Sequence, residues 1–265
     1  MDVTPTSWEE AMSLNRGDRD YEWFRLIFRP ISLLYFMVIV FWTLMLFPLY
    51  LFTGAIFSRA LGLSPLFTIL VFLFSLLGSH VNIPIKEVAS IEPLVTFRRI
   101  SFFGVSWIIP ELSRRKRRTI IAVNVGGALV PIALSLYLLL LVVPFQEPNP
   151  FVTYIKILAA LIVVTLSTNL IARPIRGVGI ATPTFLPPLI TALASLMVFQ
   201  LHTPSNPSII AYVSGTLGTL IGADLLNLEK ISRMGAPIVS IGGAGTFDGI
   251  YVTGLMAVFL VLILL

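Results

Sequence analysis

Long apolar segments separated by short polar stretches run through most of the chain. Each is close to the roughly 20 apolar residues that an α-helix needs to cross a bilayer. The pattern predicts an all-α fold: an integral membrane helical bundle of about seven transmembrane helices, with helix ends broken by glycine and proline. The predicted spans are residues 31–52, 65–85, 120–144, 151–172, 184–201, 209–225 and 248–265.

The composition agrees with a membrane location. Hydrophobic residues make up 57% of the chain and charged residues 12%, and the mean hydropathy is +0.95. Soluble domains carry about 25% charged residues. Residues 1–30 are polar and lack the apolar core of a signal peptide. We therefore predict a cytoplasmic polar N-terminal segment, residues 1–30, followed by a single transmembrane domain, residues 31–265.

The distribution of basic residues predicts the orientation. With a cytoplasmic N-terminus, only Arg59 and Lys156 of the 18 lysine and arginine residues fall on the outer side. Positive residues concentrate in cytoplasmic loops. The expected location is the cell membrane, as a multi-pass protein with its C-terminus outside.

Residues 86–118 form the longest polar connection between predicted spans. Residues 95–107 are rich in β-branched and aromatic residues, which predicts a short β-hairpin lying on the membrane surface. The connection ends in a basic run, Arg114-Arg-Lys-Arg-Arg118. Juxtamembrane runs of this kind set orientation and attract anionic headgroups. Residues 114–118 are therefore expected to contact anionic lipid headgroups of the bilayer, and no nucleic-acid partner is expected.

Polar residues gather at the predicted cytoplasmic ends of the spans. Asp224 ends the sixth span and Asp248 begins the seventh, and by this pattern no other acidic residue lies against an apolar segment. A carboxylate beside hydrocarbon is costly and is a functional hypothesis by default. Together these ends predict a polar pocket open to the cytoplasm. The other candidate substrate- or ion-binding residues are His80, Asn82, Asn124, Pro131, Asn169, Arg173, Pro188 and Asn227.

Three roles fit the two aspartates. Two close carboxylates at low dielectric share a proton, so that one acts as base on a water molecule and the other as acid, as in an aspartyl protease acting on a transmembrane peptide. Alternatively, the same aspartates with Asn82, Asn124 and Asn169 serve a cation- or proton-coupled transporter. In the third role, the aspartates cap helices in a lipid-binding scaffold. The sequence leaves all three open.

The sequence predicts neither a cofactor nor a metal site. The chain has no cysteine, and its two histidines, His80 and His202, are assigned to opposite sides of the membrane. The glycine-rich segments lack the Lys-Ser/Thr ending of a nucleotide-binding P-loop.

Four motifs resemble an archaeal and bacterial family of polytopic membrane proteins of unknown function. The resemblance covers most of the chain from about residue 65 and implies a membrane location without implying an activity. The motifs are Asn82-Ile-Pro-Ile, Asn124-Val-Gly-Gly-Ala-Leu-Val-Pro131, Gly222-Ala-Asp-Leu-Leu-Asn227 and Gly242-Gly-Ala-Gly-Thr-Phe-Asp-Gly-Ile250.

Other residues are similar to intramembrane aspartyl proteases of the presenilin and signal-peptide-peptidase class. Phe247-Asp248 resembles the aromatic-Asp pair of that class, and Ala128-Leu-Val-Pro-Ile132 or Leu186-Pro-Pro-Leu189 resembles its Pro-Ala-Leu loop. In the Gly-x-Gly-Asp motif, Ile221 and Ala223 stand at the glycine positions, and the two aspartate motifs occur in reverse order. The resemblance implies that Asp224 and Asp248 are catalytic.

Overall fold

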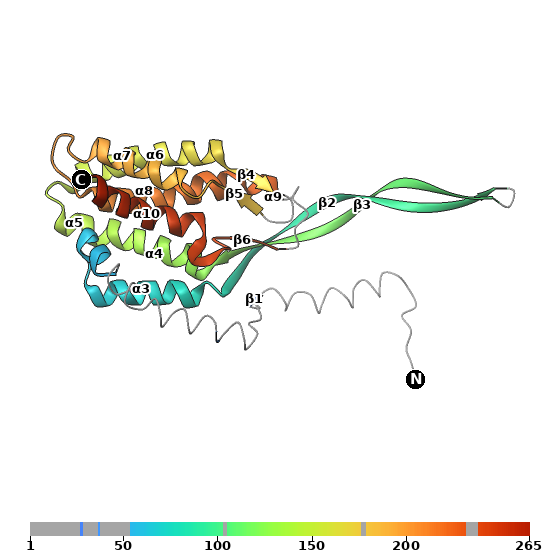
Figure 1. The fold of residues 1–265 in the computed structure, drawn as a ribbon, viewed down its shortest axis with the longest axis horizontal. Helices are drawn as coiled ribbons and strands as arrows, with labels where there is room; N and C mark the ends of the chain where they lie inside the picture. The colour runs from blue at the N-terminus through green and yellow to red at the C-terminus, as the bar shows by residue number, and fades with distance from the viewer. Residues whose placement is uncertain (1–26, 29–36, 38–53, 103–104, 176–178, 232–237) are drawn as a thin grey trace.

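A computed structural model describes residues 27–28, 37, 54–102, 105–175, 179–231 and 238–265. The chain forms a bundle of helices from which one long β-hairpin projects in the direction of the bundle's long axis (Figure 1). The C-terminus lies at the end of the bundle opposite the hairpin. The molecule therefore has a hairpin end and a far end.

Among the described residues, three helical segments are long and apolar enough to cross a membrane. A fourth candidate is a pair of helices bent by 117°, Gly54–Leu61 and α3 (Pro65–Gly78). Two apolar helices are shorter, α7 (Leu186–Val198) and α10 (Gly249–Leu264). The long segments are Val125–Gln146, which contains α4 (Val130–Tyr137) and α5 (Val143–Gln146); α6 (Pro150–Ile171); and Pro207–Asn227, which begins as α8 (Pro207–Thr219).

Asparagine and proline start both α6 and α8. The side chain of Asn149 accepts a hydrogen bond from the Val152 amide, and that of Asn206 accepts from the amides of Ser208 and Ile209. A proline follows each asparagine at the first helical position, where its missing N–H leaves nothing unpaired. The Asn-Pro pairs thus determine where these two helices begin.

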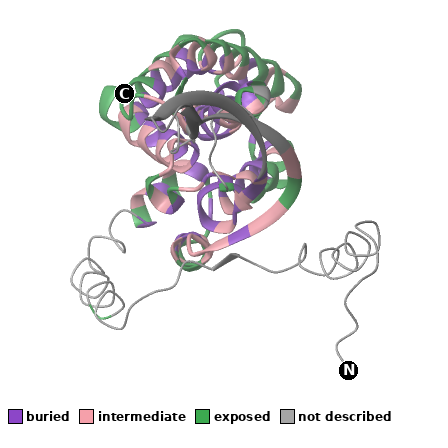
Figure 2. Ribbon diagram, turned by 90° about the vertical axis from the view of Figure 1, so that its right-hand side faces the viewer, coloured by how far each residue is buried: buried purple, intermediate pink, exposed green. Residues whose placement is uncertain are grey.

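Helix α8 is the centre of the bundle. Nearly all of its residues are buried, and α6, α7 and α10 pack around it. Buried residues lie on the faces that the helices turn toward one another, and exposed residues line the outside (Figure 2). Large apolar side chains such as Phe151 and Leu170 are exposed on that outside. An apolar exterior of this extent is suited to lipid rather than water.

The hairpin consists of β2 (Val81–Phe102) and β3 (Val105–Asn124), paired antiparallel from Asn82 opposite Asn124 to Phe102 opposite Val105. A strand of 22 residues extends over about 70 Å. At its base the hairpin is widened into a four-stranded sheet of order β1-β2-β3-β6. The added strands are β1 (Ile27–Phe28), antiparallel to β2, and β6 (Ile238–Ile241), parallel to β3.

Three prolines explain the single irregularity that the register of the hairpin shows. Proline has no N–H, and residue pairs in an antiparallel ladder alternate between hydrogen-bonded and non-hydrogen-bonded, so a proline belongs at a non-hydrogen-bonded pair. Pro93 lies at an odd-numbered position of β2. Pro110 lies on β3, and its partner on β2, Phe97, is also odd-numbered. Pro84, in contrast, lies at an even-numbered position. The register shift between Pro84 and Lys86 changes this parity, so all three prolines occupy compatible positions.

The structure confirms a mostly helical fold and corrects the extent of its β-structure. The hairpin predicted at residues 95–107 is confirmed, but it is far longer than a small surface loop and leaves the end of the bundle instead of lying across it. Residues 81–85 and 120–124, assigned above to membrane spans, belong to its strands. Apolar residues lie on both sides of each boundary, so hydropathy alone does not separate helix from strand there.

Some of the other predicted span boundaries agree with the structure and some do not. The fourth, sixth and seventh spans are confirmed as helices within a few residues. A helix at Gly54–Leu61 occupies the connection between the predicted first and second spans. Except for Met37, the predicted first span lies outside the described residues. A small two-stranded sheet of β4 (Arg173–Ile175) and β5 (Gly179–Ala181) follows α6.

Candidate functional site

The two aspartates lie at the hairpin end of neighbouring antiparallel helices. Asp224 is the last residue of a π-helical turn, η4 (Leu220–Asp224), that continues α8, and Asp248 is the N-cap of α10. Both side chains are half-buried. The methyl group of Thr219, one turn before Asp224, is 3.8 Å from the position of a β-carbon at Gly249, next to Asp248. The structure therefore brings the segments that carry the two aspartates together.

The two carboxylates have different surroundings. Asp248 Oδ1 accepts a hydrogen bond from the amide of Ile250 at 3.1 Å, and Oδ2 accepts a longer one from the amide of Ala244 at 3.4 Å. Within the described part of the chain, the Asp224 carboxylate has no hydrogen-bond partner. Asp248 is thus held by backbone donors, whereas the described residues supply no hydrogen-bond donor to Asp224.

Two of the predicted asparagines hold the turn that carries Asp224. Asn169 donates a hydrogen bond to the Gly222 carbonyl at 3.0 Å, and Asn227 donates to the carbonyls of Gly222 and Ala223 at 3.1 and 2.8 Å. A π-helical turn departs from the i→i−4 pairing of the α-helix, and such turns recur at functional sites. Asn169 and Asn227 therefore act as clamps on the backbone next to Asp224.

Asn82 and Asn124 form a second group, which fastens the hairpin to the bundle. They face each other across the ladder, and Asn124 Nδ2 donates to Asn82 Oδ1 at 3.1 Å and to the Ser79 carbonyl at 2.8 Å. Asn124 Oδ1 accepts from the Gly127 amide at 2.8 Å, and Ser240 Oγ donates to Asn82 Oδ1 at 2.6 Å. Both asparagines are buried, so their role is to pair the buried hydrogen-bonding groups at the junction of the hairpin and the bundle.

The junction continues to Asp248 through the turn that precedes it. Ser79 Oγ accepts a hydrogen bond from the Thr246 amide at 3.2 Å. Gly127 packs against the carbonyls of Gly242 and Gly245, and those two glycines have φ of 72° and 66°. Positive φ and close backbone contact both favour glycine. The base of the hairpin therefore positions the turn that ends at Asp248.

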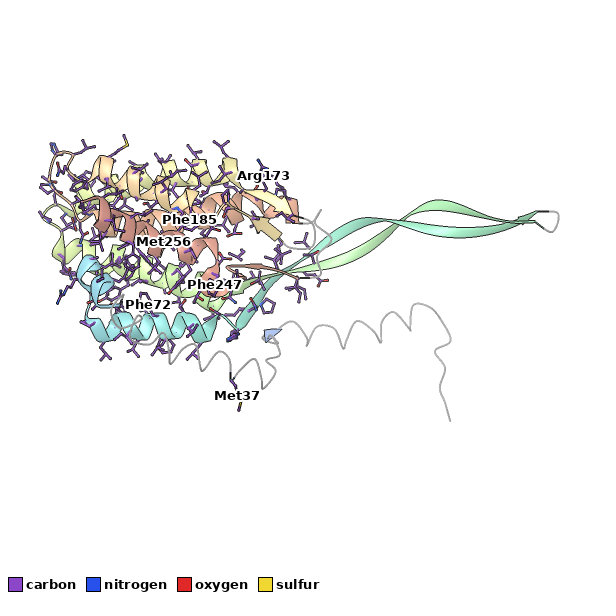
Figure 3. The ribbon with its side chains drawn as sticks, in the orientation of Figure 1. Met37, Phe72, Arg173, Phe185, Phe247 and Met256 are labelled. Carbon is purple, nitrogen blue, oxygen red and sulfur yellow. The ribbon has the colours of Figure 1, made fainter. Side chains whose placement is uncertain are left out.

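The remaining predicted residues are near the same end, but within the described residues none of them is hydrogen-bonded to either aspartate. His80 is half-buried in the turn before β2, and Arg173 is exposed on β4. Pro131 and Pro188 are buried in the first turns of α4 and α7, where a missing N–H is tolerated. Figure 3 places Arg173 at the hairpin end of the bundle. These four residues are not drawn into one site with the pair.

Sequence reasoning missed a buried hydroxyl beside the pair. Thr219 Oγ1 is buried and has no hydrogen-bond partner among the described residues. Its methyl group is 3.8 Å from the position of a β-carbon at Gly249, next to Asp248, and the Thr182 hydroxyl is 3.2 Å from the same position. Because threonine is common in apolar helices, the sequence carried no signal for it. In the part of the chain that the structure describes, no three His, Cys, Asp or Glu side chains form a metal-binding group.

A buried charge cluster at the far end corrects the expectation that only two acids lie against apolar segments. Glu147 and Lys156 are 9% and 4% exposed. Lys156 Nζ donates to Ser205 Oγ at 3.0 Å and to two backbone carbonyls after α7. Thr153 links Ser205, at 2.9 Å, to Glu147, at 3.1 Å. Lys156 inside an apolar helix was the available signal, because intramembrane charges mark special sites.

The apolar exterior, the candidate spans and the polar hairpin end define a helical membrane protein with an extended β-hairpin. The chain belongs to the DUF1614 family, described as a protein of unknown function, whose model matches residues 76–260. No curated protein and no solved structure shows a significant match. The predicted membership of a family of unknown function is confirmed, whereas these comparisons give the similarity to presenilin-type proteases no support.

Removing the Asn124 side chain should destabilise the junction. In Asn124→Leu, the Ser79 carbonyl and the Gly127 amide lose partners in a buried setting, so we expect a loss of about 2–4 kcal/mol. Thermal unfolding in detergent measures it. Gln146→Leu is the matched control, because Gln146 makes one exposed hydrogen bond, at 3.3 Å. Equal losses in the two variants would contradict the assignment.

Proposed function

We propose that this protein is a membrane-embedded hydrolase of the aspartyl-protease type that acts on transmembrane segments. Asp224 and Asp248 form its acid–base pair. The observation that carries the proposal is the asymmetry of the pair: two half-buried carboxylates at the same end of neighbouring helices, Asp248 held by backbone amides and Asp224 without a hydrogen-bond partner among the described residues. Two titratable groups with contrasting environments are the usual mark of an acid and a base with separate roles.

The asymmetry assigns the roles. Two neighbouring carboxylates at low dielectric do not both ionise, so the pair holds one proton. Backbone donors favour the ionised form of Asp248, which leaves the proton on Asp224. Asp248 then removes a proton from water as the oxygen attacks the scissile carbonyl, and Asp224 gives its proton to the carbonyl oxygen. When the C–N bond breaks, the proton on Asp248 passes to the leaving amine, and a hydroxyl of the tetrahedral diol returns a proton to Asp224 as the carbonyl of the acid product forms.

The clamps around Asp224 favour this role over an ion site built from backbone carbonyls. A discontinuous membrane helix typically binds a cation through carbonyls that the break has freed. Here the carbonyls of Gly222 and Ala223 already accept hydrogen bonds from Asn169 and Asn227. They act as fixed supports for the turn rather than as open ligands.

Cation- or proton-coupled transport is the second candidate, and the Thr219 hydroxyl, which has no partner within the described residues, favours it. Together with the two carboxylates, this hydroxyl supplies oxygen ligands of the kind that hard cations bind. In this role the pair coordinates or relays the transported ion.

Cleavage of a fluorescent transmembrane peptide in proteoliposomes tests the hydrolase. We expect the wild type to cleave and both Asp224→Asn and Asp248→Asn to lose activity by about 10³-fold or more. Asp248→Asn should retain its thermal stability, because Asn caps a helix as well as Asp. Stabilisation by added cations that disappears in both variants, without any cleavage, would favour the transporter. Variants indistinguishable from wild type in both assays would leave a structural scaffold.

We also propose that the chain crosses the membrane seven times, with the N-terminus in the cytoplasm and the C-terminus outside. The shorter α7 and α10 and residues 31–52 would complete the candidate spans. A topology reporter fused after Leu265 should be active only outside; activity only in the cytoplasm would refute the odd number of spans.

A further inference from the structure

We infer that residues 1–26 dock along the distal part of the β-hairpin of the same chain, residues 86–118, through opposite charge. The proposal concerns the hairpin and is independent of the aspartate pair. Four observations support it: the attachment point of the segment, its length, its charge and the open edges of the ribbon.

The attachment point comes from β1. Ile27 is paired with Asn82 and Phe28 with Val81, so the chain that precedes residue 27 starts on the β2 edge at the base of the hairpin. The pairing is antiparallel, so the continuing direction of β1 toward residue 26 is the direction in which β2 leaves the bundle. The segment therefore starts beside the surface that we propose it covers.

Among the described residues, none pairs with either edge of the distal ribbon. In the described part of the chain, β1 extends along β2 only to Asn82, and β6 extends along β3 only over Ile120–Val123. A two-stranded ribbon alone is marginally stable in water, and exposed strand edges are normally covered or blunted. Pro93 and Pro110 remove donors from these edges. We therefore expect charge attraction, rather than the backbone hydrogen bonds of a continuous added strand, to hold residues 1–26 on the hairpin.

The length and charge of the segment match the ribbon. Twenty-six extended residues reach about 90 Å at most, which exceeds the roughly 70 Å of the ribbon. Residues 1–26 contain six acidic and three basic residues, whereas residues 86–118 contain eight basic and three acidic. The net charges are −3 (3 − 6) and +5 (8 − 3). Attachment to the same chain raises the local concentration of the segment at the hairpin.

The position of the basic run makes membrane lipid the weaker candidate occupant, contrary to the expectation above. Arg114 is opposite Pro93 and Arg118 is opposite Ala89, so the run lies six to ten strand residues beyond Asn124, where the helical span begins. That separation is about 20–33 Å along the strand. It exceeds two Debye lengths of about 8 Å at physiological salt. Headgroups at the ends of the spans would be largely screened from the run.

Cysteine cross-linking tests the proposal, because the chain has no native cysteine. A short bis-maleimide should cross-link Ser13→Cys to Ser90→Cys on β2 within one chain. The control pair, Ser13→Cys with Leu201→Cys at the far end, should not react. The cross-linking rate should fall about threefold or more in high salt, which screens charge. The cross-linking rate should fall by a similar factor when Glu9→Gln and Glu10→Gln are added to the reactive pair. Thermal unfolding of each variant shows that it is folded.

Each alternative has its own outcome. A covalent dimer from the double variant Ser13→Cys/Ser90→Cys would assign the hairpin to a second copy and overturn the proposal. Protection of the thiol in Ser90→Cys by vesicles rich in phosphatidylglycerol, unchanged by deletion of residues 1–26, would assign the hairpin to the membrane and would also overturn it. Absence of any cross-link in folded protein would reject docking in either form.

Discussion

Replacing Lys156 by methionine should lower the free energy of unfolding by about 3–5 kcal/mol, because removal of one member of a buried charged pair leaves the other uncompensated. Lys156 is 4% exposed and donates to Ser205 and to backbone carbonyls. Ser205 and Thr153 link it to Glu147, which also accepts hydrogen bonds from the Asn206 amide. The cluster thereby joins the start of α8 to α6. Chemical or thermal unfolding in detergent measures the loss.

Two further variants make this prediction specific. Arg59→Met removes an exposed charge at the same end and should change stability by less than about 0.5 kcal/mol. Adding Glu147→Gln to Lys156→Met removes the uncompensated carboxylate and should recover part of the loss. A double variant that loses as much as the sum of the two single losses would show that the two charges do not interact.

Replacing Gly126 by alanine should separate the hairpin base from α3. A β-carbon there would collide with the Ser75 carbonyl oxygen and lie 2.5 Å from the Ser79 amide nitrogen. Both obstacles are backbone, so neither can move aside by a rotamer change. The Ser75 hydroxyl, which donates to the Gly126 carbonyl at 2.6 Å, would lose its geometry as well. We expect a loss of about 3 kcal/mol or more.

Gly54→Ala is the control for this prediction. A β-carbon at Gly54 would meet Ile69 at 3.7 Å, an ordinary contact, so thermal unfolding should show little change or a small gain. Equal effects of the two substitutions would mean that the contact between α3 and the segment after Asn124 is not tight.

The sequence predicted the elements whose signal is local. Apolar length located α6 and α10. It did not separate helix from strand at Val81 and Asn124, because apolar residues lie on both sides of each boundary and hydropathy does not distinguish the two structures. The length of the hairpin depends on pairing between residues up to 42 positions apart, and no window of hydropathy contains that information.

The candidate site was predictable in part for the same reason. Asp224 and Asp248 stood out because a carboxylate beside an apolar segment is rare. That Asn169 clamps Gly222, or that Ser240 completes the Asn82–Asn124 pair, follows only from contacts between distant segments. The cluster of Glu147 and Lys156 needed the turn after α7 to supply Ser205. The sequence identified several of these polar residues, but not the contacts that pair them across the fold.

The most direct test of the acid–base pair is an infrared difference spectrum between the wild type and Asp224→Asn at neutral pH. If the pair holds one proton, the wild type shows a protonated-carboxyl carbonyl band that Asp224→Asn lacks. Asp248→Asn should shift that band, because the neighbour of the protonated carboxyl changes from an anion to an amide. A difference spectrum with only carboxylate bands would mean that Asp224 is ionised beside Asp248 and would contradict the proposed pair.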